Sequence, residues 1–367
     1  MENAKKYAVI AVFALMIFGL AIAHWLLPDA AFSDTERRAL EQTPVFSTDA
    51  LFDGSYQSEL ETYLLEQFPM RDGFRGLKTV LNVHLWQMRD TNGYYYVDGH
   101  WMELDETLDT AQVDHAINKI NGILEKHPEI AAAYYAIVPD KNYFLAEQNG
   151  YAAMDYEALY AHMENVNAEK IDITSLLSVD DYYRTDSHWR QERLQAVTQA
   201  LCSAMGVTAA PYESYTQHEL EGFSGVYTDH TAYPLNSESL VYLENESTDN
   251  AVVSRVNEMT GQWEQIPMYD VTEFGNVDPY DVYLSGAEAL IMIDNPNATS
   301  DKHLILFRDS FSSSLAPLLT DSYAKITMVD LRYISSMYLD GFVNFENADV
   351  LFLYSTTLLN SAGGVLK

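Results

Sequence analysis

The segment Leu304-Ile305-Leu306-Phe307-Arg308-Asp309-Ser310-Phe311 leads from an unbroken apolar run directly to a serine. Such a run is typical of a strand that is buried on both faces, and the composition of residues 312–319 predicts a helix. We therefore expect Ser310 to lie at the carboxyl end of a strand and on the first turn of a helix. Ligands of open α/β sheets bind at that edge. The alternative is that Ser310 or Asp309 only caps the helix.

A second segment, Thr185-Asp186-Ser187-His188-Trp189, places a carboxylate and an imidazole two residues apart. We expect this segment, too, to lie between a strand and a helix. A serine hydroxyl needs a base to accept its proton, and a carboxylate holds that base in the right tautomer. Ser310, His188 and Asp186 are therefore the candidate nucleophile, base and orienting group of serine acyl chemistry. The alternative is that Asp186 caps the helix and that His188 packs in its first turn.

Strand and helix patterns alternate along most of the chain. Helical spacing of apolar residues predicts helices at 49–82, 108–126, 155–168 and 188–205. Short apolar runs predict strands at 132–138, 171–173, 182–185, 304–307, 324–329 and 350–354. This alternation is typical of an α/β domain with a mostly parallel central sheet. Turn residues predict a hairpin at 94–102, and the many glycines of residues 210–285 predict a β-rich insertion.

The N-terminus carries the clearest local signal. Lys5 and Lys6 precede an apolar stretch over residues 7–23 that continues to Leu27, and a helix needs roughly 20 residues to cross a bilayer. Basic residues before the stretch and acidic residues after it place the rest of the chain outside the cytoplasm. The alternative is a cleaved signal peptide, since Ala21-Ile22-Ala23 resembles a cleavage site. We expect an anchor at 1–30, a stalk and helical segment at 31–90 and an α/β domain at 91–367.

The composition limits the classes of partner. The chain of 367 residues has a formal net charge of −33, which argues strongly against nucleic-acid binding, because contacts to phosphates need clustered Lys and Arg. A content of 48% apolar and 20% charged residues describes a globular protein. The histidines show no metal-ligand spacing, and no glycine-rich phosphate loop is present. We therefore expect neither a metal nor a cofactor, and we expect the single cysteine, Cys202, to be buried.

Several segments resemble one bacterial family. Asp186-Ser187-His188-Trp189 resembles the signature of the DHHW proteins, with Ser187 where that name has a histidine. It is more distantly similar to the Asp-x-His-Trp segment of the alginate O-acetylation proteins, which have an SGNH-hydrolase-like domain. Other segments resemble this family in the same order along the chain: Ser33–Pro44, Phe68-Pro69-Met70-Arg71, Val138-Pro139-Asp140-Lys141, Asp309-Ser310-Phe311 and Asp330-Leu331-Arg332-Tyr333.

The resemblance implies a fold and an activity. The fold is an SGNH-hydrolase-like sandwich around a parallel sheet, and the triad is Ser310, His188 and Asp186. The serine would receive an acyl group, expected to be acetyl, and pass it to a hydroxyl of a cell-surface polysaccharide. Since acetyl-CoA is cytoplasmic, the donor would be a polytopic membrane-bound O-acyltransferase. We therefore expect a single-pass cell-membrane protein with its catalytic domain outside the cytoplasm.

The oxyanion site departs from the family pattern. The nearest oxyanion candidate is Gly286, but Ala287 follows it where relatives have asparagine, and Arg308 replaces the glycine of the familiar Gly-Asp-Ser block. We therefore expect the backbone N–H groups of Ser310 and Gly286 to be the oxyanion donors, and loss of one donor typically costs about two to three orders of magnitude in rate. Lys141 and Arg332 are expected substrate contacts. Two alternatives stay open: a glycan acetyl-esterase with the same triad, and a non-catalytic glycan-binding or assembly module.

Overall fold

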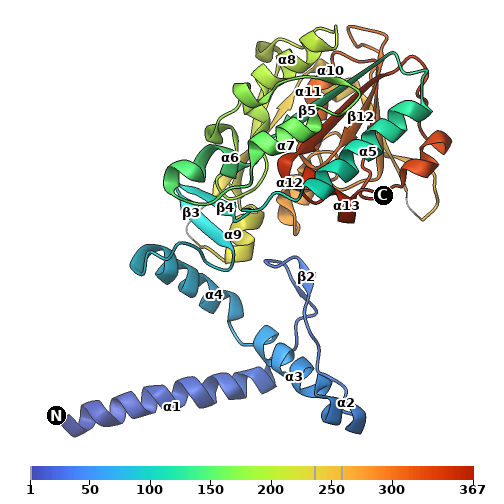
Figure 1. Cartoon of the computed structure of the whole chain (residues 1–367). Helices are drawn as coiled ribbons and strands as arrows, with labels where there is room; N and C mark the ends of the chain where they lie inside the picture. The colour runs from blue at the N-terminus through green and yellow to red at the C-terminus, as the bar shows by residue number, and fades with distance from the viewer. Residues whose placement is uncertain (1, 235–236, 258) are drawn as a thin grey trace. The chain divides into compact units, whose positions relative to one another are not determined.

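The structure is a computed structural model that describes residues 2–234, 237–257 and 259–367. Contacts divide the chain into two compact units (Figure 1). The first contains residues 1–92 and 228–235, and the second contains residues 93–227 and 236–367. The segment 228–235 thus belongs to the first unit, although it lies inside the range expected for the insertion. The expected boundaries at residues 30 and 90 stay predictions.

The first unit is mainly helical. It contains the helices α1 (Glu2–Leu26), α2 (Thr48–Asp53), α3 (Ser55–Glu66) and α4 (Arg71–Val80), the π-helical turn η1 (Leu81–Leu85), and the paired strands β1 (Phe32–Ser33) and β2 (Arg38–Ala39). The expected helical segment 49–82 is broken at Gly54 and Met70, which have φ angles of 88° and 57°. Within α1, Ala4–Leu26 is long and apolar enough to cross a membrane, a test that signal sequences also pass.

The second unit is built on one large sheet. In the described part of the chain this sheet has eight strands, in the order β10 (Trp263–Ile266), β9 (Val252–Val256), β11 (Leu290–Asp294), β13 (Lys325–Val329), β12 (His303–Arg308), β14 (Asp349–Ser355), β5 (Ala132–Val138) and β6 (Glu169–Lys170). The neighbours from β13 to β6 pair in parallel, and those from β10 to β13 pair antiparallel. The expected α/β class with a mainly parallel sheet is confirmed.

Helices cover both faces of this sheet, because successive side chains of a strand point to opposite faces. Leu304 and Leu306 belong to one core cluster, together with residues of α8 (Gln195–Ala204) and α11 (Phe311–Leu319). Ile305 and Phe307 belong to the other cluster, together with residues of α5 (Thr110–Lys126) and α7 (Tyr156–Met163). Burial on both faces explains why the sequence of β12 is apolar without interruption.

The smaller elements complete the second unit. The expected hairpin is present as β3 (Tyr94–Val97) and β4 (His100–Glu103). In the expected β-rich insertion, β7 (Thr216–Phe223) and β8 (Glu238–Glu244) form a separate pair, whereas β9 and β10 extend the large sheet. The remaining short helices of this unit are α6 (Lys141–Leu145), α10 (Glu246–Asn250), α12 (Thr356–Leu359) and α13 (Ala362–Val365). The helix α9 (Val226–Thr231) begins in the second unit and continues, from Thr228, in the first. Turns of 3₁₀ helix include η5 (Gln191–Arg193), η8 (Pro279–Val282) and η9 (Ser336–Gly341).

Candidate active site

Ser310 lies where the sequence predicts it, between the end of β12 and the first residue of α11. Its side chain makes no capping hydrogen bond to the helix. The side chain of Asp309 bonds the backbone here instead. One of its carboxylate oxygens accepts from the Phe311 N–H at 3.1 Å, and the other accepts from the Ser355 N–H at 2.7 Å. Because Asp309 satisfies the local backbone, the hydroxyl of Ser310 is left for another partner.

The second segment differs from its predicted structure. Residues 182–185 form no strand beyond a single bridge between Tyr182 and Trp189, and the helix α8 begins only at Gln195, so the expected helix at 188–205 is too long. The reason is local: Asp186 Oδ1 accepts from the His188 N–H at 2.9 Å and closes a tight turn. Asp side chains that bond the backbone two residues on compete in this way with regular structure.

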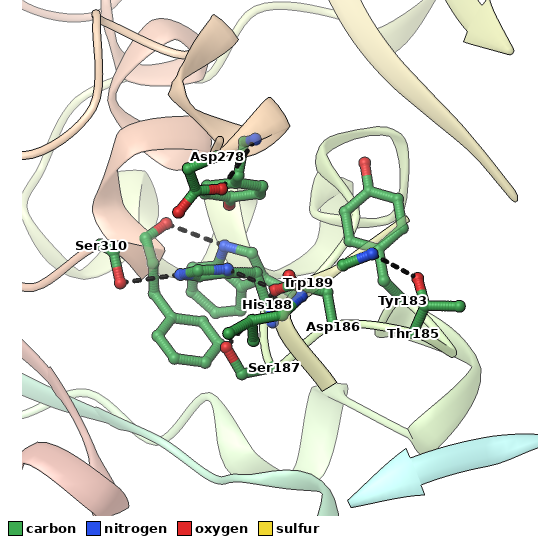
Figure 2. A network of polar contacts seen from close by, with 12 residues as sticks. Tyr183, Thr185, Asp186, Ser187, His188, Trp189, Asp278 and Ser310 are labelled. Carbon is green, nitrogen blue, oxygen red and sulfur yellow. Dashed lines mark hydrogen bonds and ion pairs between the residues drawn. The ribbon is translucent and has the colours of Figure 1, made fainter. Parts of the chain in front are cut away.

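The two segments meet in space (Figure 2). His188 Nε2 lies 2.7 Å from Ser310 Oγ, and His188 Nδ1 lies 2.6 Å from Asp186 Oδ1. An ionised carboxylate can only accept, so Nδ1 carries the ring proton and Nε2 can accept the proton of the serine. Burial by itself would raise the pKa of Asp186. The His188 ring and the N–H groups of His188 and Val226 outweigh burial and hold this pKa well below its usual range.

The buried carboxylate of Asp186 is held from a distant part of the sequence. Its second oxygen accepts from the Val226 N–H at 2.9 Å. Gly225 packs so closely that a Cβ at this position would lie 2.3 Å from Asp186 Cβ. The Gly225 N–H also donates to Thr185 Oγ1 at 3.0 Å. Sequence reasoning missed Gly225 and Val226, because nothing in a lone Ser-Gly-Val segment indicates a partner 40 residues earlier.

Tyr280, in η8, is a further residue that the sequence did not indicate. Its ring stacks on the imidazole of His188, with centroids 3.9 Å apart and planes 8° apart. Its buried hydroxyl donates to Ser314 Oγ of α11 at 2.8 Å, and burial raises its pKa well above the usual value, so the phenol stays neutral. Trp189 Nε1 donates to the Phe311 carbonyl at 2.9 Å. These contacts fix the imidazole and its loop against the helix that begins after Ser310.

The two expected oxyanion donors, the N–H groups of Gly286 and Ser310, differ in whether another group already accepts from them. Gly286 has a φ of 81°, but its N–H donates to the Tyr283 carbonyl at 3.2 Å and its carbonyl accepts from the buried Arg308 at 3.0 Å. Gly286 therefore holds Arg308 in this structure. By contrast, no acceptor among the described residues takes the Ser310 N–H. This group lies at the start of α11, where unpaired N–H groups are positively polarised.

Lys141 and Arg332 make contacts within the protein. Lys141 follows β5 and is 3% exposed; its Nζ donates to the Tyr183 carbonyl at 3.0 Å and lies 4.9 Å from the centre of the Tyr227 ring. Burial lowers the pKa of Lys141 to about 7. Arg332 forms a two-pronged ion pair with the buried Asp330, at 2.7 and 2.9 Å. Their expected roles in substrate binding stay predictions.

The described residues contain no group of three His, Cys, Asp or Glu side chains that could hold a metal ion. Cys202 is buried in α8, as expected, and burial raises the pKa of its thiol to about 11. A thiol in that state is not an activated nucleophile. The contacts of Ser310, His188 and Asp186 fit the chemistry of a serine activated by a histidine and a carboxylate.

Comparisons with known proteins agree with this fold. A DHHW family protein from Eubacterium siraeum has a solved structure with a TM-score of 0.60 and 21% identity, which covers 76% of this chain and 97% of that one. PatB1 from Bacillus cereus, solved with a sulfonyl adduct, matches with a TM-score of 0.58 and 17% identity, over 72% of this chain and 97% of its own. The O-acetyltransferase domain of Pseudomonas putida AlgJ matches with a TM-score of 0.43 and 14% identity, over 73% and 92%, too distant to carry an argument.

No curated protein matches the chain. The family model described as DHHW protein matches residues 143–329, just over half of the chain. This range holds the loop with Asp186 and His188 and also Ser310, which are the residues that the structure brings together. The chain belongs to the DHHW family.

Proposed function

We propose that this protein is a membrane-anchored serine O-acyltransferase that transfers acetyl groups to hydroxyls of a cell-surface polysaccharide. The observation that carries the proposal is the hydrogen-bonded series Ser310–His188–Asp186, with distances of 2.7 and 2.6 Å. Serine, imidazole and carboxylate in this order act as nucleophile, general base and orienting group in acyl transfer. The partly buried serine hydroxyl points to the imidazole and not into the helix that follows it (Figure 2).

Two half-reactions follow from this geometry. In the first, Ser310 Oγ attacks the carbonyl carbon of an acetyl donor, His188 takes the hydroxyl proton, and the leaving group departs with that proton. In the second, His188 takes the proton of an acceptor hydroxyl, whose oxygen attacks the acetyl-serine, and the proton returns to Ser310. Asp186 stabilises the imidazolium that forms in each step. Water as the acceptor would make the same site an esterase.

One observation favours a second candidate, a non-catalytic glycan-binding or assembly module. The Gly286 N–H, the expected second oxyanion donor, already donates to the Tyr283 carbonyl. The tetrahedral intermediate would then have the Ser310 N–H alone, and a missing donor costs about 10²–10³ in rate. We favour the enzyme, because a buried carboxylate held by four hydrogen bonds next to a histidine is a costly arrangement for a protein that needs no base.

The proposed location rests on α1. Its apolar span is long enough to cross a bilayer, and Lys5 and Lys6 before it favour an N-terminus in the cytoplasm. The second unit would then lie outside, where acetyl-CoA is absent. A polytopic membrane-bound O-acyltransferase would have to supply the acyl group. Co-purification of the full chain with such a protein tests this part of the proposal.

The test of activity uses the full chain in detergent with p-nitrophenyl acetate as donor and a polysaccharide fragment as acceptor. We expect release of p-nitrophenol and an O-acetylated fragment in the mass spectrum. Both should be lost in Ser310→Ala and His188→Ala, but kept in Ser300→Ala, because Ser300 precedes β12 and Ser310 follows the other end of that strand. Release of p-nitrophenol and acetate without acetylated fragment would favour the esterase. No release by folded wild-type protein would favour the non-catalytic module.

A further inference from the structure

A cavity of about 290 Å³ opens where β5 and β14 end, at the same edge of the sheet as Ser310. It is distinct from the triad and is lined by Glu103, Asp105, Asp140, Lys141, Tyr227 and Thr357, among others. Ligand pockets typically begin at roughly 300 Å³. The cavity therefore has room for one ring of sugar size and not for a length of polymer.

Strand register places the cavity beside the nucleophile. In β14, Leu353 pairs with Arg308 of β12 and Ser355 pairs with Val138 of β5. Asp140 follows Val138 by two residues, as Ser310 follows Arg308. Neighbouring strands lie about 4.8 Å apart and successive residues of a strand about 3.3 Å apart. Two strand spacings, together with the two-residue offset between Leu353 and Ser355, place Asp140 roughly 12 Å from Ser310. A ring in the cavity would thus have a hydroxyl, or that of the next unit, within reach of an acyl group on the serine.

The other wall of the cavity is tied to the base and its carboxylate. Lys141 Nζ donates to the Tyr183 carbonyl at 3.0 Å, and the Tyr227 N–H donates to the Thr185 carbonyl at 3.0 Å. Thr185 immediately precedes Asp186 in the sequence. Lys141 and Tyr227 of the cavity lining thus bond the backbone of residues that lie just before Asp186. A ligand bound in the cavity would therefore lie against the loop that carries Asp186 and His188.

Charge is the most specific property of the lining, which has three carboxylates and one amine. The Asp140 carboxylate is already engaged by the hydroxyls of Tyr156 and Thr356, at 2.9 and 2.7 Å. In the described part of the chain, the carboxylate of Glu103 has no hydrogen-bond partner. Asp105 accepts a bond of 3.3 Å from Asn360 and has capacity for more, because two carboxylate oxygens offer about four acceptor sites.

We propose that this cavity is the acceptor subsite and that it selects a sugar unit with a protonated amine over neutral and uronic-acid units. The inference rests on the proposed function, since it names the acceptor of the same site. The ammonium group would donate charge-assisted hydrogen bonds to Glu103 and Asp105, and the Tyr227 ring would pack on the apolar face of the sugar. A uronate would face like charges at short range. The net charge of −33 adds a long-range attraction for cationic chains.

The test measures binding without chemistry. Full-length Ser310→Ala protein in detergent is titrated by calorimetry with three trisaccharides: the trimers of glucosamine, of N-acetylglucosamine and of galacturonic acid. We expect the glucosamine trimer to bind about a hundredfold more tightly than the neutral trimer, about tenfold for each of the two charge-assisted hydrogen bonds, and the uronate to bind most weakly. Glu103→Gln and Asp105→Asn should each remove about tenfold of this preference. Glu106→Gln, at an exposed neighbour outside the lining, should not change it.

Three results would overturn the inference: equal affinity for the amine and neutral trimers, tighter binding of the uronate, or no binding of any trimer. A separate reaction of wild-type protein with a sulfonyl fluoride reports on Ser310 alone. If Ser310 reacts with the sulfonyl fluoride but the protein does not prefer the amine trimer, this inference is wrong and the proposed function stands. If Ser310 does not react but the protein prefers the amine trimer, the proposed enzyme activity is wrong and the cavity is a binding site for an amino sugar.

Discussion

Replacing Gly225 with alanine tests whether the segment before α9 holds the triad in place. A Cβ at this position would lie 2.3 Å from Asp186 Cβ, 2.6 Å from its Oδ2 and 2.7 Å from its Cα. Carbon atoms in contact prefer separations of about 3.5–4.0 Å, so the backbone of one residue must move by roughly 1 Å. The Gly225 N–H bond to Thr185 and the neighbouring Val226 N–H bond to Asp186 would be strained by the same movement.

The expected loss follows from what Asp186 does for His188. A displacement of about 1 Å at a catalytic group costs about 10²-fold in rate, and complete loss of the carboxylate's orientation costs about 10⁴-fold. We therefore expect the rate at which Ser310 reacts with a sulfonyl fluoride to fall by about 10²–10⁴. Overpacking should also lower the free energy of unfolding by roughly 1–3 kcal/mol.

The assay follows adduct formation by intact mass, with full-length protein in detergent and excess reagent. Gly122→Ala is the matched control, because a Cβ at this position in α5 meets nothing within 4 Å. It should leave the rate unchanged and raise the free energy of unfolding by about 0.4–1 kcal/mol. A folded Gly225→Ala protein that reacts at the wild-type rate would refute the idea that this close contact positions the carboxylate.

Three further changes probe other parts of the site. Asp186→Asn should lower the reaction rate of the serine by about 10⁴, because an amide no longer selects the right tautomer of His188; in the same assay, a loss below tenfold would contradict this role. Tyr280→Leu should lower that rate by about tenfold, the value of one aromatic stack, whereas Tyr280→Phe, which keeps the ring, should stay near wild type; equal losses would argue against stacking. Burial lowers the pKa of Lys141 from 10.5 to about 7. Between these two pH values the unfolded chain binds more protons than the folded protein, so the free energy of unfolding rises with pH, by up to about 1.4 kcal/mol per pH unit. Lys141→Met should remove that rise in urea titrations from pH 7.5 to 9.5, and equal slopes in both proteins would contradict it.

The parts of the fold that the sequence predicts well are those with one strong local cause. The apolar run before Ser310 is buried on both faces, so its strand and the following helix were predictable. The hairpin at 94–102 follows from its turn residues, and α5 from its regular apolar spacing. The order of family-like segments predicted the architecture, which no single segment could do.

The parts that could not be predicted depend on contacts across the sequence or on one side chain. The turn at Asp186 replaces a strand and the start of a helix, because its carboxylate bonds the backbone of His188. Gly225 and Tyr280 reach the site from the region expected to be an insertion, and only the tertiary structure brings them there. Gly286 has a left-handed φ, and its N–H is already used inside the protein, which the sequence did not indicate.

The central claim is that Ser310 is a nucleophile activated by His188. The most direct measurement is peptide mass mapping of the full chain after incubation with p-nitrophenyl acetate, together with Ser310→Ala and His188→Ala. We expect one acetyl group on Ser310 in the wild type and none on any serine in either variant. An unmodified Ser310 in folded wild-type protein, or an acetyl group that persists on Ser310 without His188, would contradict it.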